Sequence, residues 1–80
     1  MATVHFPSGL LPWTGGVAQM TVMAPRVGEL LAEVVARFPD LADQVTEMAV
    51  AVDGEIYHDG AYQPLAPDSE VHLVPRISGG

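Results

Sequence analysis

The residues best suited to chemistry are the last two, Gly79 and Gly80. Glycine has no side chain, so a Gly-Gly end can lie extended in a narrow tunnel where any Cβ atom would clash. The group available for reaction is the α-carboxyl of Gly80, which is ionised at neutral pH and is therefore a poor electrophile. Chemistry at this carbon requires activation, for which adenylation by ATP is the usual route. We therefore predict adenylation at Gly80, with Gly79 and Ser78 threading into a partner.

A terminal Gly-Gly pair is also typical of a frayed end. Here the pair follows closely after a predicted strand, and this position favours the functional interpretation. Because a short tail has too little area for specific recognition, the residues before it must contribute contacts. We predict docking through Val74, Pro75, Arg76 and Ile77, and a flexible tail over residues 75–80.

The remaining side chains do not predict a catalytic or metal centre. The sequence has no Ser/His/Asp set, no paired catalytic carboxylates and no phosphate-binding glycine loop. His5, His58 and His72 lack the spacing of metal ligands, and the absence of cysteine excludes thiolate sites and disulfides. We expect no catalytic residues, no metal and no bound cofactor, so that the protein serves an enzyme as a substrate and carrier.

The charge balance limits the possible partners. Ten acidic residues and three arginines give a net charge of -7, and lysine is absent. Such a chain cannot build a phosphate-tracking surface, which argues against nucleic acid, and an anionic membrane is an equally poor partner. No apolar run approaches the roughly 18 residues that span a bilayer. The first residues do not resemble a signal peptide, so a cytoplasmic protein is expected.

The chain that must position these residues shows two hydrophobic periods. Alternating apolar residues predict strands over residues 3–7 and 17–23, and a continuous apolar run predicts a strand over 48–52. Turn residues then lead into two further predicted strands, 55–57 and 70–74. A helical stripe predicts one amphipathic helix that begins near Pro25 and ends at Phe38; its members are Val27, Leu30, Leu31, Val34 and Phe38. Asp53-Gly54 is a strong hairpin turn.

The segments between these elements carry fewer signals. Residues 8–16 are interpreted as a loop, with Gly15-Gly16 as its hairpin turn. Trp13 in this loop is either a lid over the core or an anchor for a partner, and the lid is slightly favoured. Leu41 and Val45 indicate one further helical turn, and Asp59-Gly60 indicates another chain reversal. Leu65 is expected to insert into the core. Met20, Met23 and Met48 are expected to fill the core.

One helix and four or five strands in 80 residues define an α+β fold. The order matches a β-grasp: a mixed sheet packs on one main helix, and the first and last long strands lie parallel at its centre. Residues 1–80 then form a single domain. In this arrangement His5 and His72 become neighbours on the exposed face of the sheet.

Three segments carry a family resemblance. The turn Asp53-Gly54-Glu55, the stretch Leu65-Ala-Pro-Asp-Ser-Glu-Val71 and the ending Val74-Pro-Arg-Ile-Ser-Gly-Gly80 resemble the MoaD/ThiS family of ubiquitin-like sulfur carriers. The resemblance covers essentially the whole chain. It implies that an ATP-dependent activating enzyme adenylates Gly80, that a sulfur donor makes a thiocarboxylate, and that a second biosynthetic enzyme accepts the sulfur. The chain departs from the family at Asp68-Ser69, commonly Gly-Asp, and at Arg76, often small or apolar.

Two rival functions remain open. The same activated carboxyl would serve a ubiquitin-like modifier, which is joined to lysines of other proteins. A plain β-grasp binding subunit that never uses its tail is the other. The carrier interpretation also includes the small subunit of a molybdopterin-synthase-like complex. For a carrier, the sulfur acceptor pathway is also open between cysteine, molybdopterin, thiazole and a specialised metabolite. The acids Asp40, Asp43 and Glu47 are expected to form a solvated face that steers docking onto a basic enzyme.

Overall fold

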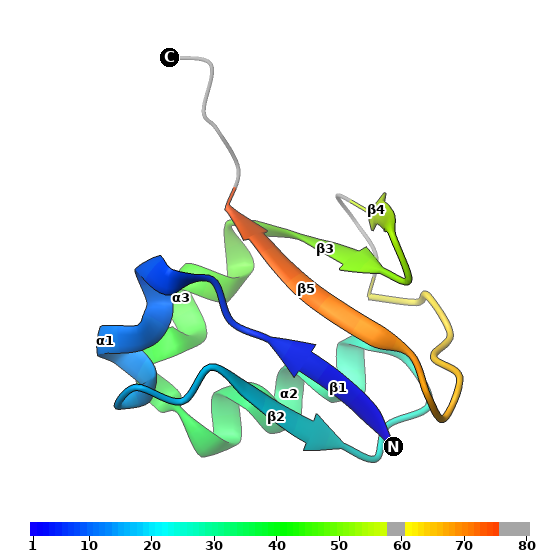
Figure 1. Ribbon diagram of the computed structural model, residues 1–80, viewed down its shortest axis with the longest axis horizontal. Coiled ribbons are helices and arrows are strands. Elements are labelled where there is room, and N and C mark those ends of the chain that lie inside the picture. Colours follow the sequence, from blue (N-terminus) through cyan, green and yellow to red (C-terminus); the bar gives the residue numbers. More distant parts are fainter. Residues whose placement is uncertain (58–60, 76–80) are drawn as a thin grey trace.

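Five strands form one mixed sheet in the computed structural model, which describes residues 1–57 and 61–75 (Figure 1). Their order across the sheet is β2-β1-β5-β3-β4. The predicted turn at Asp59-Gly60 lies outside the described residues. The strands are β1 (Ala2–His5), β2 (Gln19–Val22), β3 (Met48–Val52), β4 (Glu55–Tyr57) and β5 (Glu70–Pro75).

β1 and β5 are parallel neighbours at the centre, as the sequence predicts. Every other pairing in the sheet is antiparallel. Alternation places one set of side chains from each strand against the core, because successive residues of a strand point to opposite faces. Val4 and Val71, which face each other across the two central strands, are completely buried.

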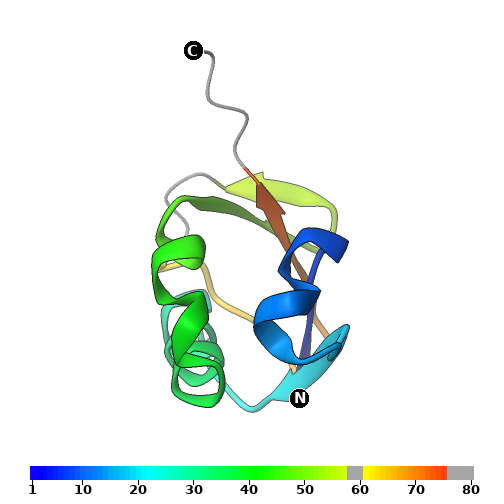
Figure 2. The same ribbon diagram turned by 90° about the vertical axis from the view of Figure 1, so that its left-hand side faces the viewer.

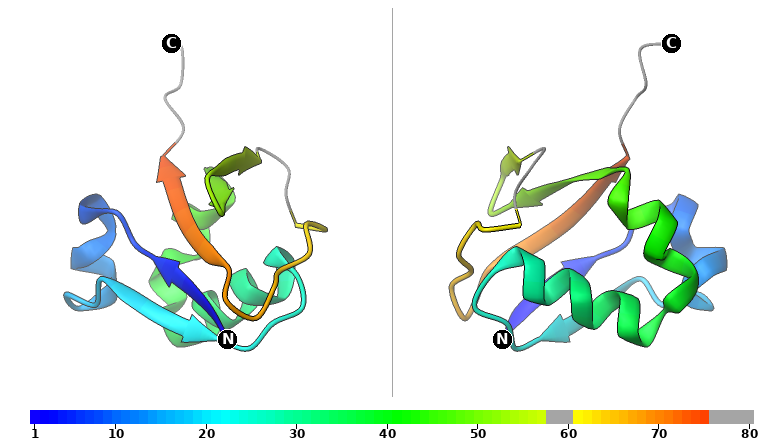
Figure 3. Two further views of the ribbon diagram at one scale, coloured as in Figure 1. Left: turned by 45° about the vertical axis from the view of Figure 1, so that its right-hand side comes forward. Right: turned by 180° about the vertical axis from the view of Figure 1, so that it is seen from behind.

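The predicted helix is α2 (Val27–Arg37), and it covers one face of the sheet (Figure 3). Its buried residues are Val27, Leu30 and Val34, as expected from the apolar stripe, and the helix ends before Phe38-Pro39. Arg26 is the N-cap, so Pro25 precedes the helix instead of occupying its first turn. Leu41 and Val45 are buried in the predicted extra turn, which comprises η2 (Pro39–Leu41) and α3 (Ala42–Thr46).

The interpretation of residues 8–16 as a loop is wrong. They form η1 (Ser8–Leu10) and α1 (Leu11–Thr14), at the side of the sheet in Figure 2. Gly15 is the C-cap of α1 at φ 67°, and its left-handed backbone ends the helix instead of closing a hairpin. Thr14 is buried, and its hydroxyl donates to the carbonyl of Val17 at 2.8 Å. A helix of four residues is too short for a hydrophobic period to reveal it.

Two further side chains were misplaced by sequence. Trp13 is 46% exposed and is not packed against the core, so it is not a lid. Met23 is 80% exposed, whereas Met20 and Met48 pack against the core as predicted, together with Leu65. Met23 lies one residue beyond the end of β2, and none of the described elements packs over its side chain.

Candidate functional site

β5 is the element that positions the predicted docking residues. It is hydrogen-bonded to β1 along one edge and to β3 along the other, with Pro75 opposite Met48. The strand extends one residue further than predicted, so Pro75 belongs to the sheet. The pairing with β1 covers only Glu70 to His72, so Val74 and Pro75, the last two residues of the strand, are paired with β3 alone.

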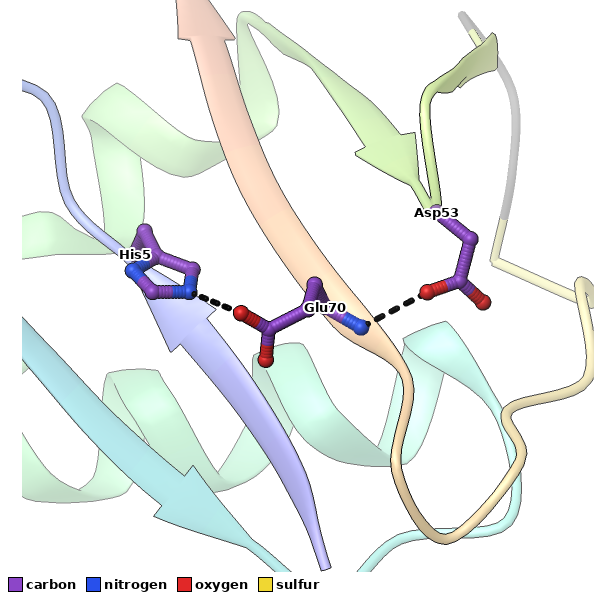
Figure 4. A network of polar contacts seen from close by, with 3 residues as sticks. All are labelled: His5, Asp53 and Glu70. Atoms are coloured by element: carbon purple, nitrogen blue, oxygen red, sulfur yellow. Dashed lines mark hydrogen bonds and ion pairs between the residues drawn. The ribbon is translucent and has the colours of Figure 1, made fainter.

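The start of β5 is held by the carboxylate of Asp53. Its Oδ1 accepts the backbone N–H of Glu70 at 2.9 Å (Figure 4). Its Oδ2 accepts the hydroxyl of buried Ser69 at 3.1 Å. The Ser69 hydroxyl in turn accepts the N–H of Ala66 at 2.9 Å. Asp53 and Gly54 form the predicted turn with φ of 49° and 91°, the left-handed backbone that Asp and Gly tolerate best.

Sequence reasoning found the Asp53-Gly54 turn but not this second role of Asp53. It also treated Ser69 only as a departure from the family pattern. The two residues are 16 positions apart, and their contact depends on the antiparallel pairing of β3 with β5. The local signal for this contact was Ser69 directly before the strand that begins at Glu70. Short polar residues at such positions typically form hydrogen bonds between side chain and backbone.

His5 and His72 meet on the sheet face that α2 leaves uncovered, as predicted. Their rings stack with centroids 4.4 Å apart and an angle of 12° between the planes. Nε2 of His5 lies 3.1 Å from Oε1 of Glu70, which draws both central strands into one polar cluster (Figure 4). The cluster therefore joins β1 to β5 through side chains as well as through the backbone ladder.

An apolar patch lies beside the histidines on the same face. Its members are Ala49 and Ala51 of β3, Ile56 of β4 and Val74 of β5, and we call this set the tail-side patch. The register pairs Ala49 with Val74 and Ala51 with both His72 and Ile56, which places all of them on one face. Ile56 is 58% exposed and is the large aliphatic side chain that this patch presents to solvent, whereas Ala49 is buried.

Of the predicted site residues, the structure therefore brings Val74 and Pro75 together at one end of the sheet, beside the tail-side patch. Val74 is half-buried and Pro75 is exposed. The predictions for Arg76, Ile77, Ser78, Gly79 and Gly80 lie outside the described residues.

Acidic groups dominate the described surface. Asp40, Asp43 and Glu47 are exposed, as predicted for a solvated face. Arg26 pairs with Glu29 on α2, with Nη2 to Oε1 at 3.3 Å. On β4, the hydroxyl of Tyr57 donates to Oε2 of Glu55 at 2.8 Å, and this hydrogen bond raises the pKa of Tyr57 above its ordinary value. Burial and the negative charges of Glu55 and Asp53 act in the same direction.

Within residues 1–57 and 61–75, no three His, Asp or Glu side chains are grouped so that they would hold a metal ion. None of the helices in this part of the chain has the length and apolar character required to cross a membrane.

The mixed five-stranded sheet, the helix across one face and a central final strand that leads to the C-terminal residues define a ubiquitin-like β-grasp protein. A family model described as the ThiS family matches residues 8–80. The chain therefore belongs to the ThiS family and is a ubiquitin-like sulfur carrier.

Solved structures of similar fold agree with this class. A chain of the Amycolatopsis orientalis BexX/CysO complex has a TM-score of 0.86 at 20% identity, with 100% of both chains covered. Small archaeal modifier protein 1 from Methanosarcina acetivorans has a TM-score of 0.84 at 16% identity, covering 99% of this chain and 95% of that one. CysO from Mycobacterium tuberculosis has a TM-score of 0.84 at 18% identity, covering 96% of this chain and 100% of that one. No curated protein sequence gives a significant match.

Proposed function

We propose that this chain carries sulfur on the carboxyl of Gly80. The observation that carries the proposal is the ThiS-family match, which extends through residue 80 and so includes the Gly-Gly tail. In the first step a Gly80 carboxylate oxygen attacks the α-phosphorus of ATP, and pyrophosphate leaves. In the second, hydrosulfide attacks the acyl carbon of the adenylate, AMP leaves with the bridging oxygen, and the S–H proton is lost to solvent. The product is a thiocarboxylate.

The chain's own part in this reaction is presentation. The protein is a co-substrate with no catalytic residue of its own, and ATP belongs to the activating enzyme. The end of β5, which is paired with β3, and the tail-side patch supply the docking surface, to which Arg76 and Ile77 add contacts. Ser78 and Gly79 then thread into the enzyme, where the absence of a Cβ atom at Gly79 lets the backbone approach closely.

A second enzyme then takes the sulfur. The Amycolatopsis orientalis structure records CysO in a complex with BexX, which supports action through a protein partner. The acceptor belongs to the biosynthesis of cysteine, molybdopterin, thiazole or a specialised metabolite. The need for ATP and a reduced sulfur donor favours the cytoplasm as the site of the reaction, and the acidic surface favours a basic enzyme over nucleic acid or a membrane.

A second candidate function is a modifier that is joined to lysines of other proteins. The similarity in fold to small archaeal modifier protein 1 favours its consideration. Both functions begin with the same adenylate, so the product must distinguish them. We propose incubating the chain with its activating enzyme, ATP and a sulfide source, followed by intact mass measurement. A gain equal to the replacement of one oxygen by sulfur supports the carrier. Conjugates of higher mass, in the presence of lysine-containing proteins, support the modifier.

A β-grasp binding subunit that never uses its tail is tested separately. Deleting Gly79 and Gly80 removes the reacting carboxyl position and leaves every described element intact. The carrier and the modifier both lose function in cells after this deletion. Full function of the truncated chain would contradict the proposal.

A further inference from the structure

A cavity of about 280 Å³ lies where β5 ends. It is surrounded by residues that follow β1, by residues in and directly after α3, by the first residue of β3 and by the last residue of β5. The apolar wall is formed by Pro7, Leu10, Met48 and Pro75, and the polar edge by Gln44 and Glu47. Because Pro75 both lines this cavity and directly precedes the tail in the sequence, an enzyme that takes the tail binds close to it, and we call it the tail-base cavity.

The polar edge gives the cavity a negative character. Glu47 is exposed at the end of α3, and Gln44 is half-buried one turn before it. Within residues 1–57 and 61–75, no arginine or histidine nitrogen lies within ion-pair distance of Glu47. The chain has no lysine, and Arg26 pairs with Glu29. An apolar group inserted here would remove water from the Glu47 carboxylate without replacing its hydrogen bonds, which is unfavourable.

We propose that the tail-base cavity receives one arginine side chain of the activating enzyme. The cavity is several times larger than the roughly 30 Å³ share of one liquid water, so it has room for a side chain. An arginine stem packs against apolar walls while its head stays polar. Its planar donors reach a carboxylate and an amide oxygen together, as Glu47 and Gln44 offer. This inference rests on the proposed function, which supplies the enzyme.

The test measures the KM of the activating enzyme for the carrier by ATP–pyrophosphate exchange. Glu47→Gln keeps the size of the side chain and removes its charge. Because a hydrogen bond to a charged group contributes about 1.5–3 kcal/mol, we expect KM to rise about tenfold or more, with kcat unchanged. Glu33→Gln is the matched control, since it removes the same charge from an exposed position on α2. It should leave KM within about twofold.

A second variant blocks the cavity without changing the charge. Gly9 lines the cavity, and a Cβ atom built there meets nothing within 4 Å. Gly9→Phe should raise KM as Glu47→Gln does, whereas Ala36→Phe, at an exposed position of α2 outside the cavity, should have little effect. Circular dichroism and thermal unfolding of each variant report whether the fold is retained.

Arg76 follows Pro75 in the sequence and is the alternative cation. If Arg76 were the occupant, the effect of Glu47→Gln would disappear in an Arg76→Ala background; if the enzyme supplies the arginine, the two effects add. Three results would overturn the inference, provided that the wild-type chain supports exchange. They are loss of the Glu47→Gln effect in the Arg76→Ala background, an unchanged KM for Glu47→Gln, and equal effects of Glu47→Gln and Glu33→Gln on KM. Absence of exchange with the wild-type chain would instead contradict the proposed function.

Discussion

Asp53 and Glu70 are bound to each other twice. The backbone N–H of Asp53 donates to the carbonyl of Glu70 at 2.9 Å, and the carboxylate of Asp53 accepts the N–H of Glu70, also at 2.9 Å. The residue that closes the β3–β4 turn thus fixes the first residue of β5. This pair therefore positions the start of β5, the strand whose last residues are the predicted docking residues Val74 and Pro75.

We expect Asp53→Ala to lower the free energy of unfolding by about 2 kcal/mol. The change removes the acceptor of two hydrogen bonds, leaves the buried Ser69 hydroxyl without that acceptor, and places alanine at φ 49°. Asp53→Asn is the matched variant: asparagine tolerates this backbone, and its Oδ1 still accepts the Glu70 N–H, so the loss should be smaller. Urea unfolding midpoints provide the measurement, and equal stability of Asp53→Ala and wild type would contradict this account.

The pKa of Tyr57 should fall when Glu55 is replaced by glutamine. The neutral phenol donates its proton to the Glu55 carboxylate, and this hydrogen bond raises the pKa of Tyr57 because ionisation would remove it. Glu55→Gln weakens the bond and removes the adjacent negative charge, so both effects lower the pKa. The measurement is an ultraviolet titration of phenolate in a Tyr62→Phe background, because the chain has two tyrosines. An unchanged titration midpoint would show that the hydrogen bond is absent in solution.

Ile56→Asp should weaken binding to the activating enzyme by about 2 kcal/mol, the scale of an interface hot spot. It places a charge in the tail-side patch, and the 58% exposure of Ile56 means that the fold should tolerate the change. Thr21→Asp adds the same charge to the same sheet face on β2, the opposite edge strand, and should bind nearly normally. Titration calorimetry gives both affinities. Equal weakening by the two variants would indicate a general effect of charge.

Gly80→Ala should abolish most ATP–pyrophosphate exchange and leave thermal unfolding unchanged. The added methyl group lies at the carbon next to the reacting carboxyl, where a narrow tunnel would exclude it. The control is Ala36→Ser, a similarly small change at an exposed position of α2 outside the tail-base cavity. Exchange at the wild-type rate in Gly80→Ala would exclude the tunnel model.

The sequence by itself determined the elements whose signals are local. The stripe from Val27 to Phe38 specifies α2, because residues three and four apart share one helix face. Alternation specifies the strands, and Asp53-Gly54 specifies the turn between β3 and β4. From these elements the parallel pairing of the first and last strands followed, and with it the contact between His5 and His72.

Only the tertiary structure decided the rest. The four residues of α1 are too few to show a period, and Trp13 and Met23 are exposed because none of the described elements packs over them. The bonds from Asp53 to Ser69 and Glu70 depend on strand register across 16 and 17 positions, and the tail-base cavity joins residues near positions 7, 47 and 75. Such contacts have no local signal, because the packing of the whole sheet and its helices sets which distant side chains meet.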